Sequence, residues 1–188
     1  MSAATARVVA YLGGQGSFSE EACRRFVPAH DLMPMADFAS VAQAVAQGSA
    51  DIAVLPVSNT HVGPIVAVHR LLAHPELRVV REQGLGVRLH LVGVPGAKLA
   101  GITRVLSHPA ALTQCAGYLA GRNWERSAMA STAEAARQVA LLNDATCAAI
   151  ASSEAAAAHG LSILAQDLQG EAENVTRFAI VERRDQFA

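Results

Sequence analysis

Short apolar runs alternate with segments of helical periodicity over most of the chain, and polar turns separate them. In the first part of the chain this pattern predicts three strands, at residues 7–12, 32–35 and 51–55. Each strand is followed by a predicted helix, and these helices begin at residue 17 and run over 38–46 and 66–72. Repeated strand–helix units of this kind favour a mostly parallel sheet with helices packed on it.

The pattern changes at residues 78–94, where two extended runs flank Gly84-Leu85-Gly86, and we interpret this stretch as a crossing between two lobes. The second lobe has predicted strands at 103–106, 126–130, 147–151 and 161–164, and predicted helices after Pro109, at 133–142 and at 152–159. A last strand, from Phe178 on, is expected to return to the first lobe. The sequence thus predicts an α/β protein of two α/β lobes, with residues 1–83 plus 179–188 in the first lobe and 84–178 in the second.

Polar turns follow the predicted strands at 13–17, 56–63, 107–109, 131–132 and 174–177. Ligands of open α/β sheets bind outside the carboxyl ends of the strands, so two lobes with facing turns predict a cleft. Free N–H groups at the starts of the following helices suit an anion. The first turn has neither the Gly-Lys-Ser/Thr of a phosphate loop nor a full GxGxxG pattern, which argues against a nucleotide cofactor.

The overall charge narrows the classes of partner. The net charge is −1 and the chain has no basic run, so strong binding to nucleic acid or to an anionic membrane is not expected. No uninterrupted apolar stretch of about 18 residues predicts a membrane span, and the N-terminus lacks the pattern of a secretory signal peptide. We therefore expect a cytoplasmic protein.

The spacing of the cysteines and histidines argues against a metal site or a set of disulfides. Cys23, Cys115 and Cys147 are widely spaced and odd in number, so they are expected to be buried thiols. The histidines at 61, 69 and 74 have irregular spacing and predict no metal site.

The densest cluster of candidate chemistry is Asn174-Val175-Thr176-Arg177-Phe178, which joins an acidic loop to an apolar strand. An amide, a hydroxyl and a guanidinium at the start of a strand suit an anionic, oxygen-rich ligand. A purely structural interpretation also stays open, with a turn at Asn174, a strand-forming Thr176, and Arg177 paired with Glu171 or Glu173. In the second lobe, Ser107 and Thr132 are expected to cap helices, His108 to begin one, and Gln114 to face either cleft or solvent.

Five segments in this order resemble the catalytic domain of prephenate dehydratases. They are residues 11–19 (YLGGQGSFS), 51–60 (DIAVLPVSNT), 107–115 (SHPAALTQC), 131–136 (STAEAA) and 174–178 (NVTRF). The resemblance implies a fold like that of type II periplasmic binding proteins, with the active site between the lobes and Thr176 as the catalytic hydroxyl. It further implies the formation of phenylpyruvate from prephenate in phenylalanine biosynthesis, and a homodimer.

The expected substrate-binding residues come from both lobes. They are Ser17, Ser58, Asn59, Thr60, Ser107, His108, Gln114, Thr132, Asn174, Arg177 and Phe178. Neither a cofactor nor a metal is expected. Two features depart from the family pattern. Ser58 stands where the family usually has Glu, and the chain ends at Ala188 without the regulatory ACT domain found in many members, so feedback control through that domain is not expected.

Three alternatives to the dehydratase stay open. A prephenate decarboxylase that does not aromatise its product is the nearest, because Ser58 replaces a carboxylate. Hydrolysis of a small ester or lactone, using Ser58, Thr60 and His61, is weaker because the GxSxG pattern is absent. A ligand-binding module without catalysis is the third, since one fold can host many functions.

Overall fold

The computed structural model describes residues 7–170 and 173–184. The chain divides into two compact units, which we describe separately. Unit 1 contains Met1–Gly14, Phe18–Gly86 and Asn174–Ala188, and unit 2 contains Gln15–Ser17 and Val87–Glu173. None of the described helices is long and apolar enough to cross a membrane.

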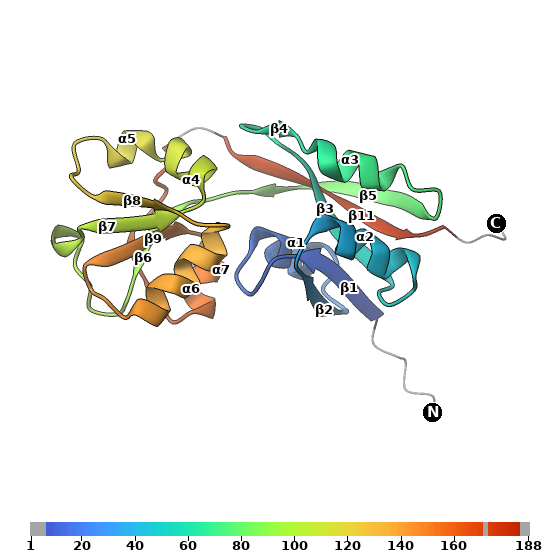
Figure 1. The fold of residues 1–188 in the computed structure, drawn as a ribbon, viewed down its shortest axis with the longest axis horizontal. Helices are drawn as coiled ribbons and strands as arrows, with labels where there is room; N and C mark the ends of the chain where they lie inside the picture. Colours follow the sequence, from blue (N-terminus) through green and yellow to red (C-terminus); the bar gives the residue numbers. More distant parts are fainter. Residues whose placement is uncertain (1–6, 171–172, 185–188) are drawn as a thin grey trace, which may run out of the picture. The chain divides into compact units, whose positions relative to one another are not determined.

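Unit 1 is built on a six-stranded sheet with the order β2-β1-β3-β11-β5, in which β4 pairs with the end of β3 (Figure 1). Its strands are β1 (Arg7–Leu12), β2 (His30–Met35), β3 (Ile52–Asn59), β4 (Gly63–Pro64), β5 (Leu77–Gly86) and β11 (Val175–Arg183). Its helices are α1 (Phe18–Phe26), α2 (Phe38–Ala46) and α3 (Val66–Leu72). The mostly parallel sheet predicted from the strand–helix pattern is confirmed only for β2, β1 and β3, because β11 is antiparallel to both β3 and β5.

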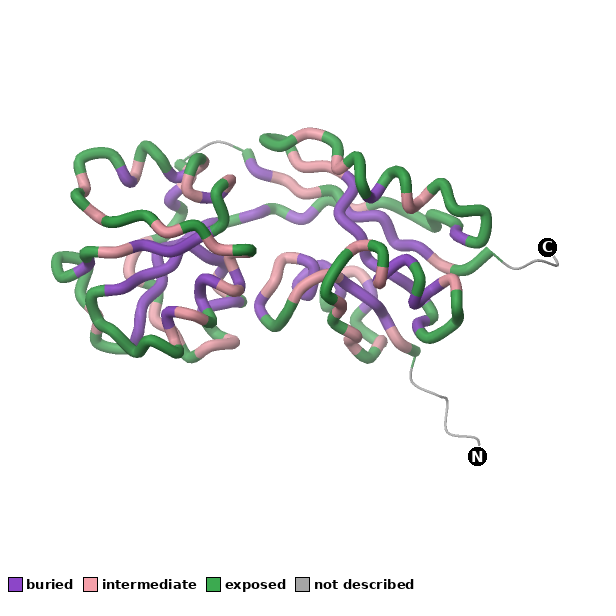
Figure 2. Tube along the Cα trace, viewed as in Figure 1, coloured by how far each residue is buried: buried purple, intermediate pink, exposed green. Residues whose placement is uncertain are grey.

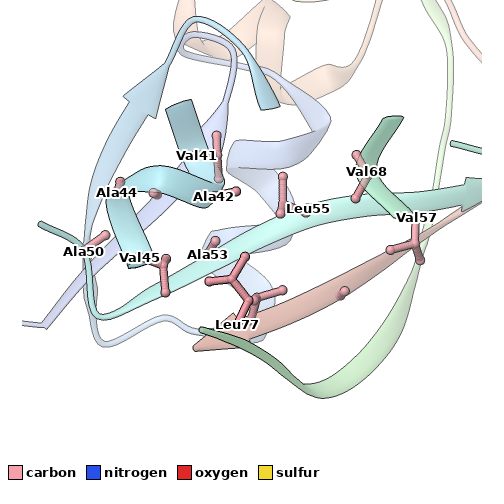
Figure 3. Close-up of a cluster of buried hydrophobic side chains, with 13 residues drawn as sticks. Val41, Ala42, Ala44, Val45, Ala50, Ala53, Leu55, Val57, Val68 and Leu77 are labelled. Carbon is pink, nitrogen blue, oxygen red and sulfur yellow. The ribbon is translucent and has the colours of Figure 1, made fainter. Parts of the chain in front are cut away.

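The core of unit 1 lies on both faces of this sheet, because β3 is buried on both sides. Ala53, Leu55 and Val57 pack with α2 and α3 on one face (Figure 3), whereas Ile52 and Val54 pack with α1 on the other. A strand buried on both faces reads in sequence as a continuous apolar run, and 52–57 has that composition.

The boundaries between the units differ from those expected. They fall at 86/87 and 173/174 instead of 83/84 and 178/179. The reason is that β5 and β11 pair over their whole lengths, from Val175 opposite Gly86 to Arg183 opposite Leu77. Residues 174–178 therefore belong to unit 1 and not to the second lobe as predicted.

Unit 2 has a five-stranded sheet with the order β10-β6-β9-β7-β8. Its strands are β6 (His90–Gly93), β7 (Arg104–Ser107), β8 (Glu125–Ala128), β9 (Cys147–Ala151) and β10 (Ser162–Ala165). Its helices are α4 (Pro109–Gln114), α5 (Ala116–Leu119), α6 (Thr132–Leu142) and α7 (Ser153–Ala158), with a short 3₁₀ turn at Leu99–Gly101. The central strand β9 is buried at every position, as Figure 2 shows, and its small residues pack beneath α6 and α7.

The N-cap residues of α6 and α4 differ from those predicted. Ser131 caps α6 by accepting a hydrogen bond from the Glu134 N–H at 3.0 Å, and Thr132 is the first helical residue. His108 caps α4, and its Nδ1 accepts from the Ala110 N–H at 3.2 Å. The caps expected at Ser107 and Thr132 are therefore wrong. Each true cap lies one residue away, because it has the extended backbone that directs its side chain at the first free N–H groups.

The short segment Gln15–Ser17 packs with unit 2 against the start of α7. Ser152 caps α7 and also donates a hydrogen bond from Oγ to the Gly16 carbonyl at 3.2 Å. Gly16 has a positive φ of +80°, and a Cβ placed on it would lie 2.6 Å from the Ala155 Cα. Both the backbone conformation and the contact require glycine at this position.

Gly16→Ala is expected to lower the free energy of unfolding by about 1–3 kcal/mol, because it combines a left-handed backbone with a backbone clash. Denaturant unfolding measures this change. Gly14→Ala, two residues away, is the matched control: no heavy atom lies within 4 Å of its added Cβ and its φ is not in the left-handed region. Equal stability of the two variants would contradict the packing described for residue 16.

Candidate active site

The end of β3 and the start of β11 lie side by side and bring two of the predicted segments together. Asn59 is opposite Thr176 and Ser58 is opposite Arg177 in an antiparallel ladder. The register shifts between Arg177 and Phe178, which is opposite Pro56. Proline within a strand is compatible with such an irregularity, because it has no N–H to donate to the ladder. The turn predicted at 56–63 is therefore wrong for its first four residues, since β3 continues through Asn59.

A network of side-chain hydrogen bonds surrounds Asn59. Its Nδ2 donates to Asn174 Oδ1 at 2.8 Å and to Thr176 Oγ1 at 2.9 Å. Its Oδ1 accepts from the backbone N–H groups of His61 at 2.9 Å and Val62 at 3.2 Å. Asn174 is 5% exposed, whereas Thr176 and Asn59 are half-buried. Hydrogen bonds thus hold the amide and the hydroxyl together at the end of the β3–β11 ladder.

Thr60 fastens the two strands beyond the end of β3. Its backbone N–H donates to the Val175 carbonyl at 3.0 Å, and its hydroxyl accepts from the Val175 N–H at 3.1 Å. This pair of bonds fixes β11 one residue before Thr176. The Thr60 hydroxyl therefore helps to hold β3 and β11 together next to Thr176.

Arg177 follows Thr176 in β11 and carries an exposed guanidinium. Its side chain is 57% exposed, and its Nε lies 3.9 Å from Glu82 Oε2 on β5, which is too long for a hydrogen bond. Sequence reasoning missed Glu82, because residues 84–86 were expected to separate two extended runs, whereas β5 continues through Gly86 and pairs with β11. Of the two predicted acidic partners, Glu171 lies outside the described residues, and Glu173 directly precedes the buried Asn174. The guanidinium remains accessible to an anion.

Phe178 has a different position from the one expected. Its ring is 1% exposed and packs among Val54, Leu85 and Ile180 in the core, with its centroid 6.4 Å from that of Phe26 in an edge-on arrangement. A side chain enclosed in this way contacts core residues and not a solvent-facing ligand. Its expected role in substrate binding is corrected to packing, because Phe178 lies with Val54 and Ile180 on the face of the sheet that packs against α1.

The other predicted site residues lie in unit 2. Ser107 ends β7, is fully buried, and donates from Oγ to the Ile150 carbonyl at 2.7 Å. His108 and Gln114 are at the two ends of α4, and Thr132 begins α6. Ser17 ends the segment that packs with unit 2.

The three cysteines offer no nucleophile. Cys23, Cys115 and Cys147 are free and buried, as predicted. Burial raises the pKa of the Cys23 and Cys115 thiols to about 12 and also raises the pKa of Cys147, so all three stay protonated at neutral pH. Within the described ranges, no group of three or more His, Cys, Asp or Glu side chains could hold a metal ion.

A groove of about 540 Å³ lies elsewhere in unit 1, between α2 and the end of α3. Its lining includes Ala42, Ala46 and Leu77, which are buried or half-buried, and the exposed Arg70 and Glu76. None of the predicted site residues lines it. Groove size alone therefore does not locate the candidate site, whose marks are the clustered donors and acceptors on β3 and β11.

Comparison with solved structures places the fold in a wider class. A nutrient binding protein from Burkholderia cenocepacia bound to methionine has a TM-score of 0.51 at 11% identity, over 94% of this chain and 84% of that chain. The prephenate dehydratase from Arthrobacter aurescens in complex with L-Phe has a TM-score of 0.85 at 30% identity, over 95% of this chain and 61% of that one. The chain thus has a periplasmic-binding-protein-like α/β fold, which confirms the predicted fold class.

Residues 9–186 match the family model described as prephenate dehydratase, and the chain belongs to that family. It is 39% identical over 175 residues to arogenate dehydratase/prephenate dehydratase 2, chloroplastic, of Arabidopsis thaliana, covering 93% of this chain and 46% of the relative. It is 34% identical over 178 residues to a bifunctional N-acyl-homoserine lactone acylase/prephenate dehydratase of Komagataeibacter europaeus, covering 95% and 63%. The chain therefore spans less than two thirds of either relative's length.

Proposed function

We propose that this chain converts prephenate to phenylpyruvate, CO2 and water as a carbon–oxygen lyase. The observation that carries the proposal is the Thr176 hydroxyl, which Asn59 holds at the start of β11. Membership of the prephenate dehydratase family supports it. A fixed hydroxyl suits the leaving hydroxyl of this substrate, and an accessible cation on the same strand suits its carboxylates.

The reaction is an elimination in which the electrons balance without an oxidant. The bond between the ring and its carboxylate breaks, and its electron pair enters the ring as CO2 leaves. The C4–O bond breaks at the other end of the ring, and the departing oxygen takes a proton to become water. Aromatisation drives both cleavages. The protein must therefore bind the pyruvyl carboxylate and stabilise the negative charge that develops on the leaving oxygen.

In this proposal Thr176 donates a hydrogen bond to the leaving oxygen. An unactivated hydroxyl is a weak acid, so its contribution is polarisation of the C–O bond more than full proton transfer. Arg177 holds a substrate carboxylate by charge-assisted hydrogen bonds. Ser58, opposite Arg177 on β3, is half-buried and lies beside this carboxylate position. Asn174 supports Asn59 from the loop before β11.

Turnover of prephenate by the purified chain tests the proposal directly. Phenylpyruvate formation is followed by absorbance, and the products are identified by NMR. Arogenate, which occurs in the name of the Arabidopsis relative, is assayed in parallel. Formation of phenylpyruvate supports the dehydratase. Formation of dihydro-hydroxyphenylpyruvate identifies a decarboxylase that does not aromatise, and binding without product identifies a ligand-binding module.

Arg177→Gln is expected to raise KM for prephenate about tenfold or more and to change kcat less than about threefold, since one charge-assisted interaction contributes about 1.5–3 kcal/mol of binding. Initial rates over a range of prephenate concentrations measure both constants. The control is Arg78→Gln, because Arg78 pairs with Glu182 on the same sheet. An unchanged KM in Arg177→Gln would remove Arg177 from the carboxylate site.

A second candidate is hydrolysis of an N-acyl-homoserine lactone, which the name of the Komagataeibacter relative favours. Ser58 is the hydroxyl considered for this activity, since it lies at the end of β3 close to His61 in sequence. Release of homoserine lactone that is lost in Ser58→Ala and kept in Thr176→Ala would support it.

The homodimer expected from the resemblance and the cytoplasmic location both stay predictions. Light scattering coupled to size exclusion tests the dimer, and fractionation of the source cells tests the location.

A further inference from the structure

We infer that Asn59 is a positioning residue: its amide directs the hydrogen of the Thr176 hydroxyl away from Asn59 and leaves that hydrogen to be donated to the substrate. This inference deepens the proposed function and rests on it. It revises the expectation that Asn59 itself binds the substrate. Three observations carry it, namely the full hydrogen-bond valence of the Asn59 amide, its fixed orientation, and its register partner on β11.

The Asn59 side chain has no hydrogen-bonding capacity left for a ligand. A primary amide has two N–H donors and a carbonyl oxygen with two lone pairs. Both donors are used, by Asn174 at 2.8 Å and Thr176 at 2.9 Å. Both lone pairs are used as well, by the backbone N–H groups of His61 and Val62. A substrate could bond to this amide only by displacing one of four existing partners.

The orientation of the amide is determined by its neighbours. Oxygen and nitrogen of an asparagine side chain are assigned from the hydrogen bonds that they make. The two backbone N–H groups of His61 and Val62 can only donate, so the atom facing them must be the oxygen. The nitrogen therefore faces Thr176 and donates to its oxygen.

The direction of the Thr176 hydrogen follows from this orientation. A hydroxyl oxygen that accepts a hydrogen bond along one direction places its own hydrogen along another. Within residues 7–170 and 173–184, Thr176 Oγ1 has no second hydrogen-bond partner. Thr176 is half-buried as a residue, so its side chain is not enclosed in the core. Asn59 thus converts a hydroxyl that could either donate or accept into a preorganised donor.

The backbone fixes the two residues relative to each other. Asn59 and Thr176 are register partners in the β3–β11 ladder, and the Thr60–Val175 bonds continue this pairing beyond the ladder. The distance between the amide and the hydroxyl is therefore set by the sheet and not by a mobile loop. Such rigidity is what a donor needs to stabilise developing charge without reorganising.

Asn59→Asp tests the inference, because it replaces the NH2 group of the amide with an oxygen and keeps the shape of the side chain. One carboxylate oxygen can still accept from His61 and Val62, but the other now accepts where the amide donated. The Thr176 hydroxyl turns to donate to this oxygen and is lost to the substrate. We expect kcat for prephenate to fall about 100-fold, the effect of losing one preorganised donor, with KM changed less than about threefold. An unchanged kcat in a folded Asn59→Asp variant would overturn the inference.

The double variant separates positioning from direct contact. If Asn59 acts only through Thr176, then Asn59→Asp added to Thr176→Ala lowers kcat no more than about threefold below Thr176→Ala alone. If Asn59 touches the substrate independently, the two losses multiply. Multiplied losses would overturn the inference while leaving the dehydratase proposal intact.

A measurement without turnover keeps the two proposals distinguishable. In ¹⁵N spectra of the folded chain, the side-chain NH2 of Asn59 is expected to exchange slowly with solvent, because both hydrogens are bonded. Thr176→Val keeps the side-chain shape and removes the acceptor, so exchange of the Asn59 NH2 is expected to speed up at least about tenfold. The control Thr113→Val, which loses only a bond to the Pro109 carbonyl in unit 2, leaves it unchanged. Equal exchange in all three proteins would overturn the inference even if no prephenate is turned over.

Discussion

Thr176→Ala is expected to lower kcat for prephenate by a factor of about 100 to 1,000, the usual effect of removing one donor that stabilises developing charge. The loss falls on kcat because the leaving oxygen acquires charge only as the C–O bond breaks. KM depends mainly on the carboxylate contacts and is expected to change little. Steady-state rates with prephenate measure both constants, and thermal unfolding confirms that the variant is folded.

Two matched variants test whether the loss of kcat in Thr176→Ala is due to the missing hydroxyl. Thr176→Ser keeps the hydroxyl on the same strand and is expected to retain turnover within about tenfold of the wild type, since only the methyl group that restricts its rotamer is lost. Thr113→Ala removes a threonine hydroxyl that bonds to the Pro109 carbonyl in unit 2 and is expected to leave kcat unchanged. A Thr176→Ala variant with wild-type kcat would reject Thr176 as the catalytic group.

Phe178→Ala is expected to lower the free energy of unfolding by about 3–5 kcal/mol, the cost of deleting a buried aromatic ring and leaving a cavity. Phe178 is enclosed between Phe26 of α1 and the apolar residues of β3, β5 and β11. Denaturant unfolding measures the change. The matched control is Val80→Ala on the neighbouring strand β5, where the side chain is 50% exposed and the expected loss is below about 1 kcal/mol. A loss as small as that of the control would show that Phe178 does not anchor the core.

These two variants lie two residues apart on one strand and affect different properties. Thr176 lies before the register shift and takes part in the polar network, whereas Phe178 lies after it and belongs to the core. Phe178 lies in β11 between β3 and β5, and its ring packs edge-on against Phe26 of α1. Stability and turnover are thus separable by mutation within a single strand.

Much of the local structure could be predicted from the hydrophobic pattern. The predicted limits of β1, α2, α3 and β9 agree with the structure, because each is a compact apolar run with clear breakers on both sides. The errors arise where a partner strand extends an element. β3 continues through Pro56 and β5 continues through Gly84 because both pair with β11, and local propensity contains no information about that pairing.

The candidate site could be predicted only in part, again because local sequence contains no information about strand pairing. Both halves of the Asn59–Thr176 contact were recognised as polar segments at strand ends. Their contact spans 117 positions in sequence, so no local pattern shows that the amide and the hydroxyl meet. The misassigned Phe178 and the missed Glu82 have the same cause, since strand pairing determines which face each side chain occupies.

The placement of β11 also has a consequence for synthesis on the ribosome. β11 separates β3 from β5 in the sheet, yet it follows every other element of both units along the chain. While the polypeptide emerges, β5 therefore has no neighbour in its own sheet, and both strands expose open edges. Unit 2, whose main segment ends at Glu173, can be completed earlier. Because domains form from the N-terminus during translation, the first unit to begin is the last to close, and Thr176 reaches Asn59 only in that final step.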